Sequence, residues 1–445
     1  MFGGSPPLHP EFTTSQIRVR LMVSAKPRVL TTAWALVAAF GTYFCMYAFR
    51  KPFTAAEFPG TVFGDMGWKA TLVMAQVAGY TISKFIGIRV VSELSGGKRA
   101  MVILGLIGAS ELALFGFPLI PQPWSCVLMF LNGLCLGMVF GLVLGFLEGR
   151  RMSEALAAGL CASFILADGV MKSVGKGLLS TGVSQEWMPF VAGLCFFGPL
   201  LLFVWMLTRI PPPDQADILA RSKRDTLSAQ ERRALVRRHA LGLFFVILMY
   251  LLVTILRSIR ADFAPEIWKG LGYEPAASAF STTEIWVALG VLFVNSIIVC
   301  IHDNRVAFFV ALGICFIGFV LLGASLLGLR TGWIGPFEFM VFLGLGLYFP
   351  YVMVHTTVFE RLLAVTRDKG SASFLLQLAD SYGYLGYIAV MFGKGFLARG
   401  ESFIEFFTGL LVFVSALSAL LVIGAFIYFY KKQSSTREAI NGTVV

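Results

Sequence analysis

Long apolar runs separated by short polar loops extend over most of this chain. Each run is close to the roughly 20 residues that a helix needs to cross about 30 Å of hydrocarbon. The pattern predicts an all-α membrane protein with twelve transmembrane helices. The predicted spans are 29–50, 69–91, 100–120, 125–148, 155–178, 189–208, 241–260, 280–300, 305–327, 333–356, 372–395 and 404–430.

A long polar interval after the sixth span divides the chain into two halves of six helices, which we expect to be pseudo-symmetric and to surround a central cavity. Within this interval, SAQE at 228–231 has the spacing of a capping box and favours a short basic helix on the inner membrane surface, with a solvated linker as the alternative. The expected regions are a cytoplasmic tail at 1–28, an N-terminal half at 29–208, a basic linker at 209–240, a C-terminal half at 241–430 and a second cytoplasmic tail at 431–445.

Composition supports a membrane protein and excludes a soluble one. Of 445 residues, 57% are hydrophobic and only 14% are charged, which is unlike any soluble globular class. The net charge of +11 comes mostly from lysine and arginine in short loops, where it indicates membrane orientation and not nucleic-acid binding. We predict a multi-pass protein of the inner cell membrane, with both termini on the cytoplasmic side and the lipid bilayer as its surroundings.

Signals for catalysis, metals and cofactors are missing from the sequence. Seven cysteines are scattered singly through apolar segments without a CxxC pair, as is typical of small core residues. The sequence has only four histidines and contains neither a Walker loop nor a GxSxG motif. We therefore expect no enzyme activity, no metal and no cofactor.

The fourth predicted span contains a row of glycines. They stand at every fourth position, so they lie on one face of a helix and leave it without side chains. We expect this face to pack closely against a neighbouring helix, and the alternative is a surface along which helices slide. The glycines are at positions 133, 137, 141, 145 and 149.

Several ionisable residues fall within the predicted spans. A charged side chain at membrane depth costs about 2.5 to 3.5 kcal/mol on insertion scales, and such residues usually mark a pathway or a binding site. They are Arg50, Lys51, Lys84, Asp168, Lys172, Arg257, Arg260, Glu284 and Asp380.

Tyrosines precede the basic residues at helical spacing in both halves. Residues at i, i+4 and i+7 share one face of a helix, so each set predicts a tyrosine face that ends in a cation. We expect a basic group from each half to face a common central axis. The sets are Tyr43, Tyr47 and Arg50 in the first span, Tyr80 and Lys84 in the second, and Tyr250, Thr254 and Arg257 in the seventh.

A simpler interpretation of Arg50 and Lys51 is that both anchor the first helix at the outer membrane interface. The distance from Val29 to Arg50 is about 32 Å at 1.5 Å per residue, which would allow the arginine to reach the headgroups. Four basic residues near the outer side would, however, be unusual for a membrane protein. Sequence pattern leaves both interpretations of Arg50 open, whereas Lys51 points elsewhere on the helix and is expected to be an anchor.

The same residues resemble motifs of the organophosphate:phosphate antiporters of the major facilitator superfamily, the group of the bacterial glycerol-3-phosphate transporter. The resemblance extends over both halves. The chain resembles a divergent, uncharacterised bacterial branch of this group. The matching segments are TYFCMYAFRKPFTAA with Tyr43, Tyr47, Arg50, Lys51 and Phe53, YTISKF with Tyr80 and Lys84, RSIRADFAP with Arg257, GYLG at 383–386 and YFPYVMV at 348–354.

The resemblance implies a binding site for phosphate between the two halves. Arginine suits this role because its planar fork binds phosphate through two hydrogen bonds and stays charged. Two departures affect the candidate coupling or gating residues: an aspartate stands where the family has a site histidine, and Asp380 is an additional acid. The implied substrate-binding residues are Arg50, Arg257, Lys84, Tyr43, Tyr47 and Tyr80, and the candidate coupling or gating residues are Asp168, Lys172, Asp380 and Glu284.

We therefore predict a monomeric secondary transporter of a small anionic, phosphorylated metabolite that works by alternating access, in exchange for phosphate. Phosphate or an organophosphate is the expected partner, and nucleic acid is not. Two alternatives remain at this point. One is a proton-coupled symporter of organic anions, in which one of the buried acids binds the proton. The other is a membrane sensor of sugar phosphates with a transporter-like fold. His355 near the end of the tenth span is interpreted as structural.

Overall fold

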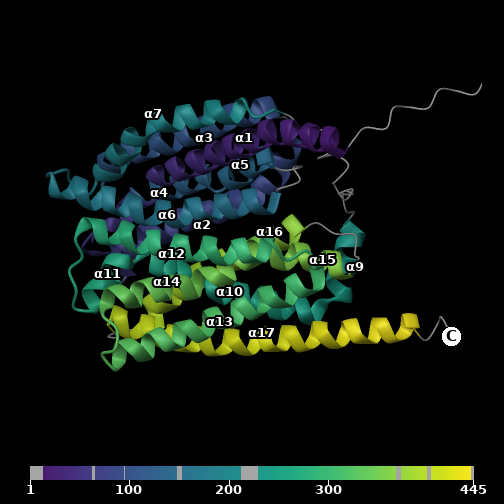
Figure 1. The fold of residues 1–445 in the computed structure, drawn as a ribbon. Helices are drawn as coiled ribbons and strands as arrows, with labels where there is room; N and C mark the ends of the chain where they lie inside the picture. The colour runs from purple at the N-terminus through teal and green to yellow at the C-terminus, as the bar shows by residue number, and fades with distance from the viewer. Residues whose placement is uncertain are drawn as a thin grey trace, which may run out of the picture.

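The computed structural model describes residues 14–62, 66–94, 96–147, 153–211, 229–366, 372–397 and 402–441. Long helices lie side by side in one bundle, and α1 begins at the same end of the bundle at which α17 ends (Figure 1). We call this end the terminal end and the other the far end. The predicted loops around 149–151 and 367–369, and most of the linker, lie outside the described residues.

Seven helices form the first group, shown in purple to blue in Figure 1. Short turns and one two-stranded antiparallel hairpin connect them. The helices are α1 (Thr14–Met46), α2 (Trp68–Glu93), α3 (Gly96–Gly116), α4 (Cys126–Leu136), α5 (Val139–Leu147), α6 (Ser153–Ser180) and α7 (Met188–Thr208). The connecting elements are the 3-10 helices η1 (Tyr47–Phe49), η2 (Pro52–Ala55) and η3 (Phe117–Leu119) and the strands β1 (Thr61–Val62) and β2 (Met66–Gly67).

The second group follows the linker and is drawn in green to yellow in Figure 1. One short stretch within it, η4, is a π-helix. The elements are α9 (Ala229–Arg238), α10 (Ala240–Asp262), α11 (Ala264–Gly270), α12 (Ala277–Val299), α13 (Asn304–Arg330), α14 (Pro336–Met353), η4 (Val354–Val358), α15 (Phe359–Thr366), α16 (Ala372–Leu397) and α17 (Phe403–Asn441). The short α9 agrees with the helix expected after SAQE, although Ser228 lies outside the described residues.

The prediction of an all-α membrane protein is confirmed. Among the described residues, ten helical segments are long and apolar enough to cross a membrane. The two other predicted spans are α2 and α16, which have 26 residues each and are therefore about 39 Å long, sufficient for a crossing. They carry Lys84 and Asp380 with several tyrosines, so the polar residues predicted for a site lower the hydropathy of these two helices.

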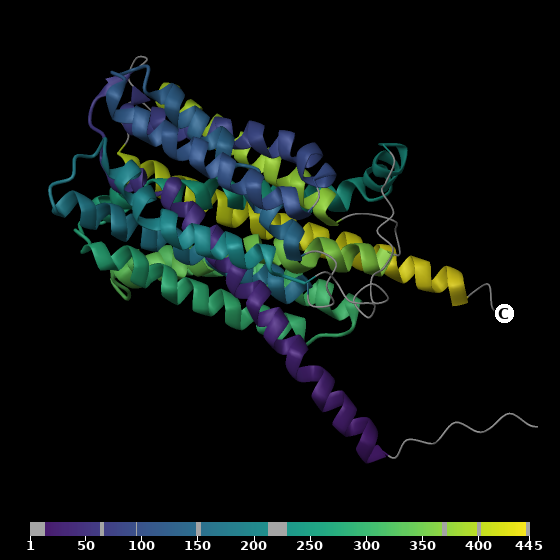
Figure 2. The ribbon, with the colours of Figure 1, turned by 90° about the horizontal axis from the view of Figure 1, so that it is seen from above.

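The first and last helices differ most from their predicted boundaries. The first helix begins at Thr14, within the predicted tail, and its N-terminal part projects from the bundle (Figure 2). It ends at Met46, before Arg50, because the chain changes to the 3-10 turn η1. The last helix continues to Asn441, beyond the predicted end at 430.

Each group packs mainly within itself, and two pairs of helices form most of the contacts between the groups. In the first group α1 contacts α6 and α7, and α2 contacts α4. In the second group α10 contacts α16 and α17, and α13 contacts α14. Contacts between the groups run along α6 with α12 and along α2 with α16 (Figure 1). Side chains of α2 and α16 therefore meet at the interface between the halves.

The predicted glycine face is a site of close helix packing. A Cβ atom built on Gly137 would lie 2.6 Å from the Cβ of Ser83, and one on Gly133 would lie 2.8 Å from the carbonyl carbon of Gln76. Both distances are too short for real atoms, so only glycine permits α4 to approach α2 this closely. This contact fixes the position of α2, and with it Tyr80 and Lys84, within the first group.

Candidate functional site

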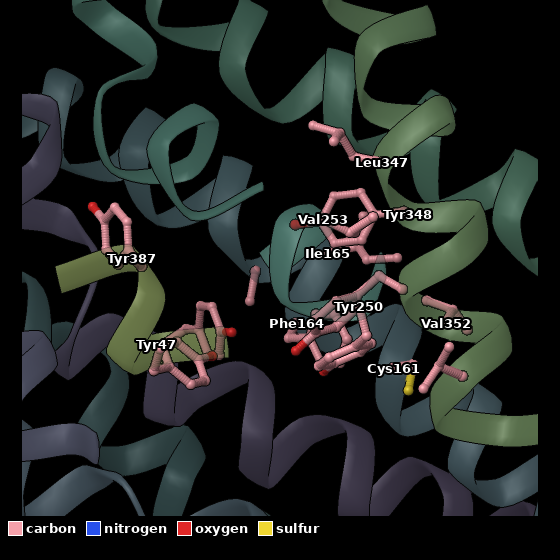
Figure 3. Packing of buried hydrophobic residues seen from close by; sticks show 14 of the residues in the cluster. Tyr47, Cys161, Phe164, Ile165, Tyr250, Val253, Leu347, Tyr348, Val352 and Tyr387 are labelled. Carbon is pink, nitrogen blue, oxygen red and sulfur yellow. The ribbon is translucent and has the colours of Figure 1, made fainter. Parts of the chain in front are cut away.

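A small cavity lies between the two groups of helices. Residues from α1, η1, α2, α5 and α6 form one side, and residues from α10, α14, α16 and the π-helix η4 form the other. Aromatic rings make up most of the wall. The lining residue Phe164 packs in turn near the buried rings of Tyr250 and Tyr348, which are not lining residues (Figure 3). The cavity is lined by Tyr43, Tyr47, Tyr80, Lys84, Phe140, Phe164, Arg257, Tyr351, His355, Asp380 and Tyr384.

Arg50 is buried inside the helix bundle, beside this cavity. It follows the turn η1, and its side chain is 5% exposed. The guanidinium lies 3.9 Å from the centre of the Tyr80 ring and 5.9 Å from that of Tyr47, both of which line the cavity. Arg50 is not itself a lining residue; it borders the cavity through these two rings. The anchor interpretation of Arg50 therefore does not fit its position.

Arg257 approaches the cavity from the other group of helices. It lies on α10, where Tyr250 and Thr254 precede it at the predicted helical spacing. Its guanidinium lies 4.3 Å from the centre of the Tyr351 ring, and its Nη2 donates a 3.4 Å hydrogen bond to the hydroxyl of Tyr384. The centre of the Tyr384 ring lies 5.0 Å from Nζ of Lys84 and 5.4 Å from the centre of the Tyr80 ring, over which Arg50 lies. The structure thus brings Arg50, Lys84 and Arg257 close to two neighbouring tyrosine rings.

Lys84 and Asp380 form an ion pair across the interface between α2 and α16. Asp380 also accepts a hydrogen bond from the Tyr250 hydroxyl, and its Oδ1 lies 4.0 Å from Nε2 of His355. All four residues are close to the cavity, and three of them line it. His355 is therefore part of the wall of the cavity, whereas the sequence suggested only a structural role.

The expectation that Lys51 is an anchor is wrong. Its ammonium lies 2.5 Å from Oδ1 of Asp262 and 3.2 Å from Oδ1 of Asp168. Asp168 also forms an ion pair with Lys172 one helical turn later, as the i, i+4 spacing predicted. Asp262 in turn accepts a 2.9 Å hydrogen bond from the hydroxyl of Tyr387. Lys51 therefore joins a carboxylate of its own half to a carboxylate of the other half.

Asp168 consequently does not occupy the place of a ligand-binding histidine. It is not among the lining residues, and both of its oxygens face lysines. Glu284 is also not among the lining residues. Its Oε1 lies 2.7 Å from Nη1 of Arg260, within the second group. Of the four candidate coupling or gating residues, Asp380 is the one that lines the cavity.

Replacing Arg260 with methionine is expected to destabilise the protein. The residue is 1% exposed and also donates a 3.0 Å hydrogen bond to the carbonyl of Met340. Its removal leaves Glu284 buried without its cation, which costs about 3 to 5 kcal/mol. The double change Arg260→Met with Glu284→Leu should restore much of the melting temperature in detergent, since it removes both charges. Equal melting temperatures of the two variants would contradict this account of the pair.

Seven lysine and arginine side chains are buried in the described structure, and five of them have a carboxylate partner. The pairs are Lys51 with Asp262, Lys69 with Glu266, Lys84 with Asp380, Lys172 with Asp168 and Arg260 with Glu284. Within the described residues, neither Arg50 nor Arg257 forms an ion pair with a carboxylate. Arg50 contacts the ring of Tyr80, and Arg257 contacts the ring of Tyr351 and donates hydrogen bonds to two hydroxyls. The buried carboxylate Glu111 forms no ion pair with any of these described cations. Two positive charges are therefore in excess at the interface between the halves.

Sequence reasoning missed several residues of this arrangement. Asp262 follows Arg257 in RSIRADFAP, so its position five residues after a site arginine was a usable signal. Tyr384 lies within the matched GYLG segment but was not assigned a role. Tyr351 and His355 share one face of α14 and η4, where their ring centres lie 4.4 Å apart and the rings pack at an angle of 34°.

Comparison with known proteins assigns a family. A family of unknown function (DUF5690) matches residues 52–432, which is most of the chain. The chain belongs to DUF5690. No curated protein is significantly similar to it. Its fold is similar to that in the crystal structure of a D-xylose–proton symporter, with a TM-score of 0.61, 12% sequence identity, and coverage of 89% of this chain and 97% of that chain.

At this identity the likeness shows the fold alone. This DUF5690 chain is thus a multi-pass helical membrane protein with that fold. Membership of the organophosphate:phosphate antiporter group stays a prediction.

Proposed function

We propose that this protein is a secondary transporter that moves a small dianion, such as inorganic phosphate or a phosphate monoester, by alternating access. The observation that carries the proposal is the pair of buried arginines without carboxylate partners, one from each half. Burying an uncompensated charge is costly. A ligand that carries two negative charges offsets both arginines at once, and phosphate esters carry about −1.5 to −2 at pH 7.

The position of the arginines links ligand binding to movement of the halves. Arg50 belongs to the first group of helices and Arg257 to the second, so an anion between them attracts both. Tyr80 now covers the Arg50 guanidinium, and we propose that its ring turns away when an anion binds. Lys84 and Tyr384 lie close enough to add hydrogen bonds, and the aromatic lining suits a sugar or another organic group attached to the phosphate.

Exchange of one anion for another follows from the same charge balance. An empty site would retain two uncompensated cations while the halves closed around it, which disfavours return of the empty carrier. A second dianion removes this obstacle. We therefore propose antiport of phosphate and a phosphorylated metabolite across a cell membrane, with the terminal end on the cytoplasmic side.

Proteoliposomes test this proposal. Vesicles loaded with unlabelled phosphate should take up labelled phosphate from outside, whereas vesicles loaded with chloride should not. Unlabelled glycerol phosphate and sugar phosphates should compete for uptake, and xylose should not. Labelled phosphate that enters chloride-loaded vesicles as fast as phosphate-loaded ones would contradict the exchange mechanism.

A second candidate is proton-coupled symport of an organic anion. It is favoured by Asp380, a carboxylate in the wall of the cavity with His355 beside it. A proton on Asp380 would release Lys84 to the anion. Uptake into chloride-loaded vesicles that requires an inwardly directed proton gradient, and that Asp380→Asn makes independent of the gradient, would favour symport over exchange.

A further inference from the structure

We propose that Gln76 and Asn132 are positioning residues for anion binding, because they fix the break in the first helix that directs Arg50 toward the site. The inference rests on the proposed function, and it adds two residues that do not contact the anion. Both are buried, on α2 and α4 respectively.

The break at the end of α1 leaves backbone carbonyl groups that need donors. The hydrogen bonds of this turn go to the carbonyls of Tyr47 and Lys51. Pro52 has no N–H group, so the carbonyl of Phe49 lacks the donor that a continuing 3-10 turn would supply. Within a membrane no bulk water is available to satisfy such a carbonyl. Side chains must therefore do so if the break is to persist.

The two amides supply these donors. Nδ2 of Asn132 lies 2.9 Å from the carbonyl oxygen of Phe49, and Nε2 of Gln76 lies 3.2 Å from that of Arg50. The amides also bind each other, because Nε2 of Gln76 lies 2.7 Å from Oδ1 of Asn132. Nδ2 of Asn132 contacts Oγ of Ser110 at 2.7 Å, which ties the group to α3.

Residues of one helix, α2, thus contact both the backbone carbonyl and the guanidinium of Arg50. Gln76 binds its carbonyl, and Tyr80, one helical turn later on α2, supports its guanidinium. Were the amides absent, the turn at Phe49 and Arg50 would lose its donors, and α1 could continue as a regular helix or rearrange. Either change would move the guanidinium off the face of Tyr80 and away from Arg257. The amides therefore act on anion affinity through Arg50.

The test measures binding of inorganic phosphate to the purified full-length protein by calorimetry. Asn132→Leu and Gln76→Met, which keep the side-chain volume, should each weaken binding about tenfold, as expected for loss of a buried hydrogen bond. Asn295→Leu is the matched control, because Asn295 is an equally buried asparagine whose partners are Val291 and Thr356 in the second half. It should lower the melting temperature similarly but leave phosphate affinity unchanged.

A double-mutant cycle separates positioning from general loss of stability. In an Arg50→Lys background, Asn132→Leu should weaken phosphate binding much less than in the wild type, because the residue acts through the arginine. Wild-type affinity in Asn132→Leu, or the same loss in both backgrounds, would overturn the inference while leaving the proposed function intact. If the wild type binds neither phosphate nor phosphate monoesters, the proposed function fails and the inference fails with it.

Discussion

Arg257→Met is expected to abolish phosphate exchange without lowering the melting temperature of the anion-free protein. The reason is that Arg257 is 7% exposed and has no carboxylate partner among the described residues. Its removal deletes half of the excess positive charge that we propose attracts the anion. It also removes a buried charge whose desolvation is not offset by an opposite charge, so the empty protein should be as stable or more stable.

The measurement combines exchange in proteoliposomes with thermal unfolding in detergent. Exchange should fall by a factor of about 100 or more, in line with loss of a charge-assisted bidentate contact. Arg50→Met should behave in the same way from the other half. Arg260→Met is the control. Because Arg260 has a carboxylate partner, its replacement should lower the melting temperature, whereas replacement of Arg257 should not. Undiminished exchange in both Arg257→Met and Arg50→Met would remove the basis of the proposed function.

Lys51→Met is expected to reduce both the stability of the protein and the rate of phosphate exchange. Adding Asp262→Asn to this variant should restore the stability but not the exchange. Lys51 bridges the halves through Asp262 and keeps a second carboxylate, Asp168, within its own half. When the halves separate at this point, Lys51 can remain paired with Asp168 while Asp262 enters water. The single change leaves Asp262 buried without its cation, at a cost of about 3 to 5 kcal/mol. The double change removes both members of the bridge.

The location of this bridge predicts which end of the protein becomes more accessible. Two further ion pairs join the halves near the far end, Lys69 with Glu266 at 2.5 Å and Lys269 with Glu57 at 3.3 Å. In Figure 1 the helix α11, which carries Glu266 and Lys269, lies at that end. Loss of the Lys51 bridge should therefore favour separation of the halves at the far end and slow the return to the closed state.

A cysteine reporter measures this separation. Ser173 of α6 is half-buried and donates a 2.6 Å hydrogen bond across the halves to the carbonyl of Ala277 at the start of α12. In a background without native cysteines, Ser173→Cys should react with a membrane-impermeant maleimide several-fold faster when Lys51→Met and Asp262→Asn are present. A double variant with normal exchange and unchanged labelling would show that the bridge contributes stability alone.

Many residues of the site could be predicted from the sequence, because each belongs to a pattern that extends over only a few positions. Apolar runs of span length predicted the membrane helices, and the i, i+4 spacing of Asp168 and Lys172 predicted an ion pair that the structure contains. The i, i+4, i+7 spacing of Tyr250, Thr254 and Arg257 correctly placed these residues on one helix. It failed for Arg50, because the first helix ends at Met46 and the arginine follows a turn that periodicity does not reveal.

The sequence alone determined the class of this protein, the approximate spans and the residue types with which it faces its interior. Hydropathy and helical spacing depend on residues that are close together in the sequence, so a short segment is enough to recognise them. Only the tertiary structure decided which charges meet. Lys51 and Asp262 are 211 positions apart, and Lys84 and Asp380 are 296 apart. Pairing over such separations depends on how two helix bundles pack, and that packing left Arg50 and Arg257 as the two buried cations of the described structure without a carboxylate.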